Sequence, residues 1–227
     1  MSKNIEDHRV GHRQRLKERF IKSPSSVHDY EILEMVLFCS IPRRDVKGLA
    51  KILLKEFSDI SGILNATHEK LLSVEGITES VYANIRLMKE VFSRSLKTNI
   101  STKNILSSWN SLIEYLQASQ GNMPTEQFRI LFLNKKNILI ADELQETGTI
   151  DQTPVYPREV VKRALFHEAS AIILVHNHPS GNPKPSPEDI ALTGHITDAC
   201  ETIGVLVHDH VIICKHDFYS FKSNMLL

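Results

Sequence analysis

The sequence has little of what marks a secreted, membrane-bound or strongly charged protein. Only three of its 227 residues are cysteine. They lie in apolar surroundings without Cys-x-x-Cys spacing, so we expect buried free thiols and a reducing, cytoplasmic compartment. No apolar stretch is long enough to cross a membrane, and the charged segment 1–15 does not look like a signal peptide. The formal net charge is zero, so overall charge gives no attraction to nucleic acid.

Charge and polarity nevertheless divide the chain into two parts. Residues 1–100 hold 17 of the 27 Lys and Arg residues and 13 of the 27 Asp and Glu residues, which leaves 10 and 14 for residues 101–227. The mildly basic first part permits an anionic partner without demonstrating one. The polar stretch 98–103 has no hydrophobic periodicity and is the natural linker. We therefore predict a helical domain over residues 1–98 and a second domain over residues 105–227.

The first part has the hydrophobic periodicity of helices joined by short turns. Helices are predicted over residues 8–20, 29–38, 45–57 and 71–96, the last interrupted by a tight turn at Gly76. This turn resembles the helix-hairpin-helix, which binds nucleic-acid phosphates through backbone amides. However, Thr78 stands where that motif has its second glycine, and Glu75 and Glu79 would repel phosphate. Both a structural helical hairpin and weak DNA binding by this domain remain open.

The second part alternates between strand and helix patterns in the order β-β-α-β-α-β-β, after a helix at residues 109–116. The predicted elements cover residues 126–134, 138–147, 156–165, 171–175, 187–203, 205–214 and 218–221. This order predicts a mixed sheet flanked by helices. Together with the helical first part, it makes the fold class α/β (α+β).

A possible metal-binding pattern follows the predicted strand 171–175. His176 and His178 are two residues apart, so on an extended segment both imidazoles point to the same side. The loop after them ends at Ser186, a helix N-cap residue followed by proline. Asp189 then lies in the first helical turn, where its carboxylate can face the histidines. Two nitrogens and one oxygen form a three-ligand zinc set that leaves a fourth position for water, as in catalytic sites.

The complete string His-x-His-x₇-Ser-x₂-Asp is identified as the JAMM signature of the JAB/MPN metalloproteases. Asn177 and the following Pro179-Ser180-Gly181 make it similar to the bacterial RadC branch, with the resemblance extending over nearly the whole chain. This resemblance implies a JAB/MPN domain of cytidine deaminase-like fold that holds one Zn²⁺ per chain. It also implies hydrolysis of an amide bond in an unknown protein or peptide substrate. RadC proteins carry a traditional DNA-repair label.

The resemblance also implies roles for two further residues. The family places a glutamate on an early strand as general acid/base, and the segment starting at Glu126 matches that strand. Glu143, Glu146 and Glu168 are the alternatives. By the same resemblance, Ser186 hydrogen-bonds the developing oxyanion or the water; its alternative role is simply that of the helix N-cap.

A second histidine pair occurs in His208-Asp209-His210. Strand alternation predicts that His208 and His210 share one face and that Asp209 lies on the other. A carboxylate here could orient the metal-binding histidines. Because the predicted ligand set is already complete, we expect His210 to pack structurally rather than to bind the metal.

Three other functions compete with amide hydrolysis. In the first, the chain is a DNA-binding accessory protein whose second domain is a non-catalytic scaffold. A nuclease using the same metal is also consistent with the pattern. A zinc deaminase is excluded, because the required His-x-Glu and Pro-Cys-x-x-Cys strings are absent.

Overall fold

The structure, a computed structural model, describes residues 3–145 and 155–227, with side chains from residue 11 onwards. Contacts divide the chain into a helical unit, Met1–Phe92, and a sheet-containing unit, Ser93–Leu227. Helix α6 (Glu79–Ser101) belongs to both units. The prediction of a linker starting at residue 98 is therefore wrong. The hydroxyls of Thr98 and Ser101 bond to helical carbonyls four residues earlier, and Ile100 is fully buried.

The helical unit contains the predicted helices and one further short helix, α4, and its apolar core is formed by residues 33–85, without a contribution from α1. Its elements are α1 (Lys3–Lys22), a 3₁₀ turn (Pro24–Ser26), α2 (Asp29–Ser40), α3 (Lys47–Phe57), α4 (Ile60–Asn65), α5 (His68–Leu72) and the first part of α6. Leu37, Leu53 and Leu71 are among its most buried side chains. This unit is therefore an all-helical body, as the hydrophobic periodicity predicts.

The predicted hairpin lies between α5 and α6. Gly76 has a φ of 93°, a conformation that side-chain-bearing residues rarely adopt, and the Leu49 side chain packs against it. Glu79 begins α6 and its carboxylate bonds to His68 at 2.9 Å. The turn is thus present, and it carries an acidic side chain held in place by a histidine.

The second unit is built on one five-stranded sheet of order β2-β1-β3-β4-β5. Its strands are β1 (Phe128–Leu133), β2 (Leu139–Leu144), β3 (Ala171–Asn177), β4 (Leu206–Ile213) and β5 (Phe218–Ser220). Its helices are α7 (Trp109–Gln120), α8 (Pro157–Phe166) and α9 (Pro187–Glu201), with 3₁₀ turns at Ile105–Ser108 and Lys222–Asn224. The pair β3–β4 is parallel and the other pairs are antiparallel. The predicted mixed sheet and its chain order are confirmed.

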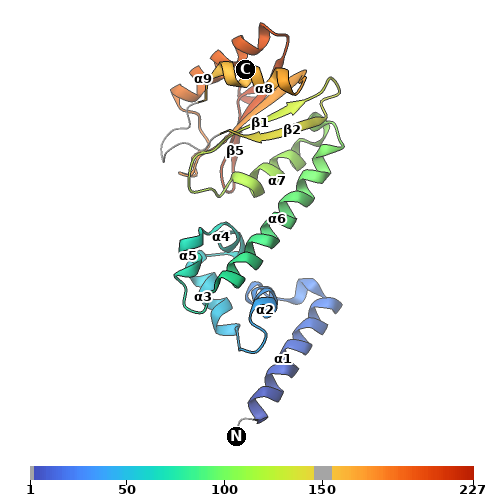
Figure 1. Ribbon diagram of the computed structural model, residues 1–227, viewed down its shortest axis with the longest axis vertical. Coiled ribbons are helices and arrows are strands. Elements are labelled where there is room, and N and C mark those ends of the chain that lie inside the picture. Colours follow the sequence, from blue (N-terminus) through green and yellow to red (C-terminus); the bar gives the residue numbers. More distant parts are fainter. Residues whose placement is uncertain (1–2, 146–154) are drawn as a thin grey trace. The chain divides into compact units, whose positions relative to one another are not determined.

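Helices cover both faces of this sheet. Helices α8 and α9 lie on one face, and α7 lies on the other (Figure 1). Strand β3 is buried along its whole length. Ile173 and Val175 face the α7 core, whereas Ile172 and Leu174 face the core under α8 and α9. The strand therefore delivers its last residues to the carboxyl edge of the sheet, next to the start of α9.

A β-bulge in β4 overturns one prediction. Ile172 pairs with Val207, but Ile173 pairs with Asp209, so His208 is the extra residue. Its Nε2 lies 2.7 Å from Asn137 Oδ1, whereas His210 contacts His176 and Thr193. The two histidines thus have separate surroundings. Strict alternation fails because the bulge shifts the strand by one position.

The expectations about cysteines and membranes can also be compared with the structure. Cys200 and Cys214 are buried, as expected, but Cys39 is exposed. It lies near the end of α2, on a side that the helical core does not cover. Among the described residues, no helix combines the length and the apolar character needed to cross a bilayer.

Candidate metal centre

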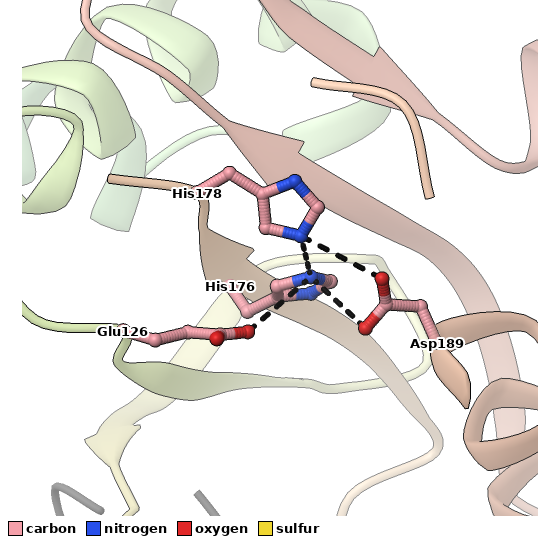
Figure 2. A group of neighbouring side chains, drawn as sticks. All are labelled: Glu126, His176, His178 and Asp189. Carbon is pink, nitrogen blue, oxygen red and sulfur yellow. Dashed lines mark hydrogen bonds and ion pairs between the residues drawn. The ribbon is translucent and has the colours of Figure 1, made fainter. Parts of the chain in front are cut away.

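Four side chains converge at the carboxyl edge of the sheet (Figure 2). Glu126, His176, His178 and Asp189 each offer one ligand atom, and these atoms all lie within 4.8 Å of one another. The two histidine Nε2 atoms are 2.9 Å apart. Asp189 lies 3.3 Å from the Nε2 atom of His176 and 3.6 Å from that of His178. Glu126 Oε1 is 3.8 Å from His176 Nε2. The structure thus brings together all three predicted ligands and the predicted acid/base.

The local sequence explains these positions. His176 is the last residue but one of β3. His178 lies just after the strand, and its amide still donates a hydrogen bond to the Ile213 carbonyl of β4. Ser186 caps α9: its hydroxyl accepts from the Asp189 amide, and Asp189 Oδ2 accepts from the Ser186 amide. The Ser186 hydroxyl also lies 2.7 Å from Asp189 Oδ2 and donates to it. The helix cap therefore aims the Asp189 carboxylate at the two imidazoles.

The electrostatics of the cluster favour a positive charge at its centre. Burial alone would raise the pKa of Asp189, but the neighbouring imidazoles of His176 and His178 and the hydrogen bond from Ser186 outweigh it and hold that pKa below its ordinary value. The pKa of His178 is raised, chiefly by its bond to Asp189. Two imidazole nitrogens and a carboxylate are ligands that Zn²⁺ prefers, and they leave a coordination position open. The donor set therefore fits one zinc ion.

Comparisons with known proteins agree with this geometry. A sequence model of the RadC-like JAB domain matches residues 106–226, more than half of the chain. The chain belongs to the RadC family. It is also 47% identical to a UPF0758 protein of Ruegeria pomeroyi over 213 residues, which are 93% of this chain and 95% of that protein. The family predicted from the motif is confirmed.

Glu126 reaches this RadC site from a loop and not from a strand as predicted, because β1 begins only at Phe128. The reason is the side chain of Asn177, which is fully buried. Its Oδ1 accepts from the Gln127 amide at 2.9 Å, and its Nδ2 donates to the Thr125 carbonyl at 3.1 Å. Asn177 thus fastens the chain on both sides of Glu126. From the sequence alone, Asn177 is recognised only as a residue typical of the RadC branch.

Two of the three alternative glutamates, Glu143 and Glu168, do not belong to the four-residue group. Glu143 is bonded to Arg163 and His167, and its pKa is lowered, mainly by the Arg163 bond. Glu168 is exposed after α8 and is not part of the four-residue group. Glu146 lies outside the described residues. Glu126 therefore remains the acid/base candidate.

The residues of His208-Asp209-His210 differ in their relation to the site. Asp209 accepts hydrogen bonds from Ser220, the Lys222 amide and the His210 amide. The hypothesis that it orients the metal-binding histidines is therefore wrong, because the C-terminal segment uses its carboxylate. His210 lies behind His176, completely buried, and burial lowers its pKa well below the ordinary value.

Proposed function

We propose that this RadC-family chain is a zinc-dependent hydrolase that cleaves an amide bond in a protein or peptide substrate. The observation that supports it most is the convergence of the three ligand atoms with the Glu126 carboxylate on one side of the sheet edge. A closed structural zinc site has four protein ligands and needs no further carboxylate beside them. The arrangement here has the parts of a catalytic site.

Each residue has a defined part in this proposal. Zinc held by His176, His178 and Asp189 would lower the pKa of a water molecule and polarise the scissile carbonyl. Glu126 takes the proton from the attacking water and delivers it to the leaving amine. Its side chain is 27% exposed, whereas that of His176 is 2% exposed, so the Glu126 side chain is open to solvent.

Ser186 can stabilise the oxyanion in this proposal only if its hydroxyl changes its hydrogen-bond partner. Its one proton goes to Asp189 Oδ2, and its lone pair accepts from the Asp189 amide. The geometry supports the N-cap function and the orientation of Asp189. Stabilisation of the oxyanion would require the hydroxyl to turn towards the substrate, and it stays a prediction.

The experiment combines one substitution with an unbiased substrate screen. Wild type and Glu126→Gln are loaded with zinc and incubated with a peptide library, and new termini are counted by mass spectrometry. We expect both proteins to hold one zinc, and the variant to cleave about 10²- to 10⁴-fold more slowly, because proton transfer contributes that much. Glu143→Gln is the matched control and should cleave like wild type. Full hydrolysis by Glu126→Gln would refute the assignment of the base.

The alternative function, DNA binding by the helical unit, stays a prediction. Its turn carries Glu79, which is held by His68, and the exposed Glu75. Both carboxylates oppose a phosphate at this position. Binding of full-length protein to duplex DNA that weakens steeply with salt would support this function, and its presence would not exclude hydrolysis by the second unit.

A further inference from the structure

A chain of hydrogen bonds lies behind His176, on the side away from the metal cluster. His176 Nδ1 is 2.8 Å from His210 Nε2. The other nitrogen of that ring, Nδ1, is 2.6 Å from Thr193 Oγ1. The Thr193 hydroxyl in turn lies 2.5 Å from the backbone carbonyl of Asp189, one turn earlier in α9. The chain thus connects two of the metal-binding residues through two residues outside the ligand set.

The chemistry of these groups determines the direction of every proton in the chain. A carbonyl only accepts, so the single proton of the Thr193 hydroxyl goes to Asp189. The Thr193 oxygen can then only accept, so His210 Nδ1 carries a proton. In the neutral ring, His210 Nε2 is left as an acceptor, and His176 Nδ1 donates to it. His176 therefore presents the lone pair of Nε2 to the cluster, as a zinc ligand must.

The surroundings leave the His210 ring and the Thr193 hydroxyl no other hydrogen-bond partners among the described residues. His210 is 0% exposed and Thr193 is 1% exposed, so water does not replace either contact. The His210 ring stacks on Phe221 with centroids 4.6 Å apart, and Phe128 packs against its edge. Packing therefore holds the ring in one orientation, and its hydrogen bond to Thr193 determines which ring nitrogen is protonated.

We propose that Thr193 and His210 are positioning residues that fix the tautomer of His176 and so prepare it to bind the metal. This inference rests on the proposed metal site and adds to it a relay that begins at Asp189. A histidine whose outer nitrogen has a fixed acceptor binds a metal more tightly than one that must first lose a competing tautomer.

Thr193→Val tests the relay, because valine keeps the shape of threonine and removes the hydroxyl. Without that acceptor, His210 can carry its proton on Nε2 and donate to His176, which moves the proton of His176 to the metal side. We expect zinc affinity, measured by competition with a chromophoric chelator, to fall about tenfold. Thr193→Ser restores the hydroxyl and should restore the affinity.

Thr197→Val is the matched control. Thr197 lies one turn later in α9, and its hydroxyl donates to the Thr193 carbonyl at 2.9 Å without touching an imidazole. This variant should bind zinc like wild type. Circular dichroism of wild type and the three variants identifies any variant that fails to fold. The zinc affinities of Thr193→Val and Thr193→Ser are then compared with each other, because one lacks the hydroxyl and the other keeps it.

A second measurement does not depend on the metal. In the metal-free protein, ¹⁵N chemical shifts of His176, taken about two pH units above the ordinary histidine pKa, report which nitrogen carries the proton. Wild type and Thr197→Val should show protonated Nδ1, and Thr193→Val a mixture of both tautomers. If Thr193→Val keeps protonated Nδ1 and binds zinc as tightly as Thr197→Val, the relay is refuted. If wild type binds no zinc, the proposed hydrolase fails, and the ¹⁵N shifts alone decide the relay.

Discussion

Replacing Asn177 with alanine should loosen the segment that carries Glu126 while leaving every metal ligand in place. The amide bonds to the Gln127 amide at 2.9 Å, the Thr125 carbonyl at 3.1 Å and the Met123 carbonyl at 3.4 Å. A buried hydrogen bond contributes about 1 kcal/mol net, and a group left without a partner costs about 1–3 kcal/mol. The bond to Met123 is long, and Thr125 and Gln127 are half-buried. We therefore expect a loss of about 2 kcal/mol in the free energy of unfolding.

The assay is urea unfolding of the zinc-saturated protein, followed by zinc affinity and hydrolysis of a peptide found in the library screen. Zinc affinity should stay within about threefold, because the hydrogen bonds of the Asn177 side chain go to the backbone of residues 123, 125 and 127 and not to a ligand side chain, and second-sphere contacts to ligands are what change affinity. Hydrolysis should fall about 10²-fold, since a displacement of about 1 Å of a catalytic group has that effect. Asn110→Ala, at an exposed position of α7, is the control and should change stability by less than about 0.5 kcal/mol.

Two outcomes would refute this reasoning. A stability loss no larger than that of Asn110→Ala would mean that the three hydrogen bonds of Asn177 contribute nothing to the fold. A large loss of zinc affinity would mean that Asn177 supports the ligands directly and not the loop of Glu126.

Two further predictions concern stability away from the site. Asp142 is buried against Arg129, Lys97 and Tyr115, so Asp142→Asn should cost about 3 kcal/mol in urea unfolding near neutral pH. Burial alone would raise the pKa of Asp142, but Arg129 and the other partners hold it below 3.8. The Asp142 carboxylate therefore contributes its full stabilisation above the ordinary pKa of aspartate, and this contribution falls as the pH drops through the lower pKa of the folded state. A difference in the free energy of unfolding between wild type and Asp142→Asn that stays constant in acid would contradict this. Gly204, in the turn that follows α9, has a φ of 71° and open space around it, so Gly204→Ala should cost about 1 kcal/mol. A thermal midpoint equal to that of wild type would show that the strain is absent.

The convergence of the candidate ligands could be predicted from the sequence because local rules place them. Strand alternation directs His176 and His178 to one side, and the Ser186 cap fixes Asp189 in the first turn of α9. The order of strands and helices follows from hydrophobic periodicity for the same reason. These features need only neighbours within about ten residues along the chain.

The features that were missed depend on contacts between distant segments. The bulge at His208 is set by the pairing of β4 with β3, and no turn or proline in the sequence marks it. The role of Asn177 arises from bonds to residues about fifty positions earlier. A polar residue inside a run of buried strand residues is the signal that could have identified it, since a buried amide must find partners. The continuation of α6 to Ser101 was not predicted, because residues with hydroxyl side chains are also common in linkers.

Zinc content is the most direct test of the central claim, that His176, His178 and Asp189 form one metal site. The full-length protein and His178→Ala are purified, loaded with zinc, dialysed, and analysed by inductively coupled plasma mass spectrometry, with His195→Ala as a control in the exposed part of α9. The account predicts one zinc per chain in wild type and in the control, and almost none in His178→Ala. A wild type without zinc, or a His178→Ala variant that holds as much as wild type, would contradict it.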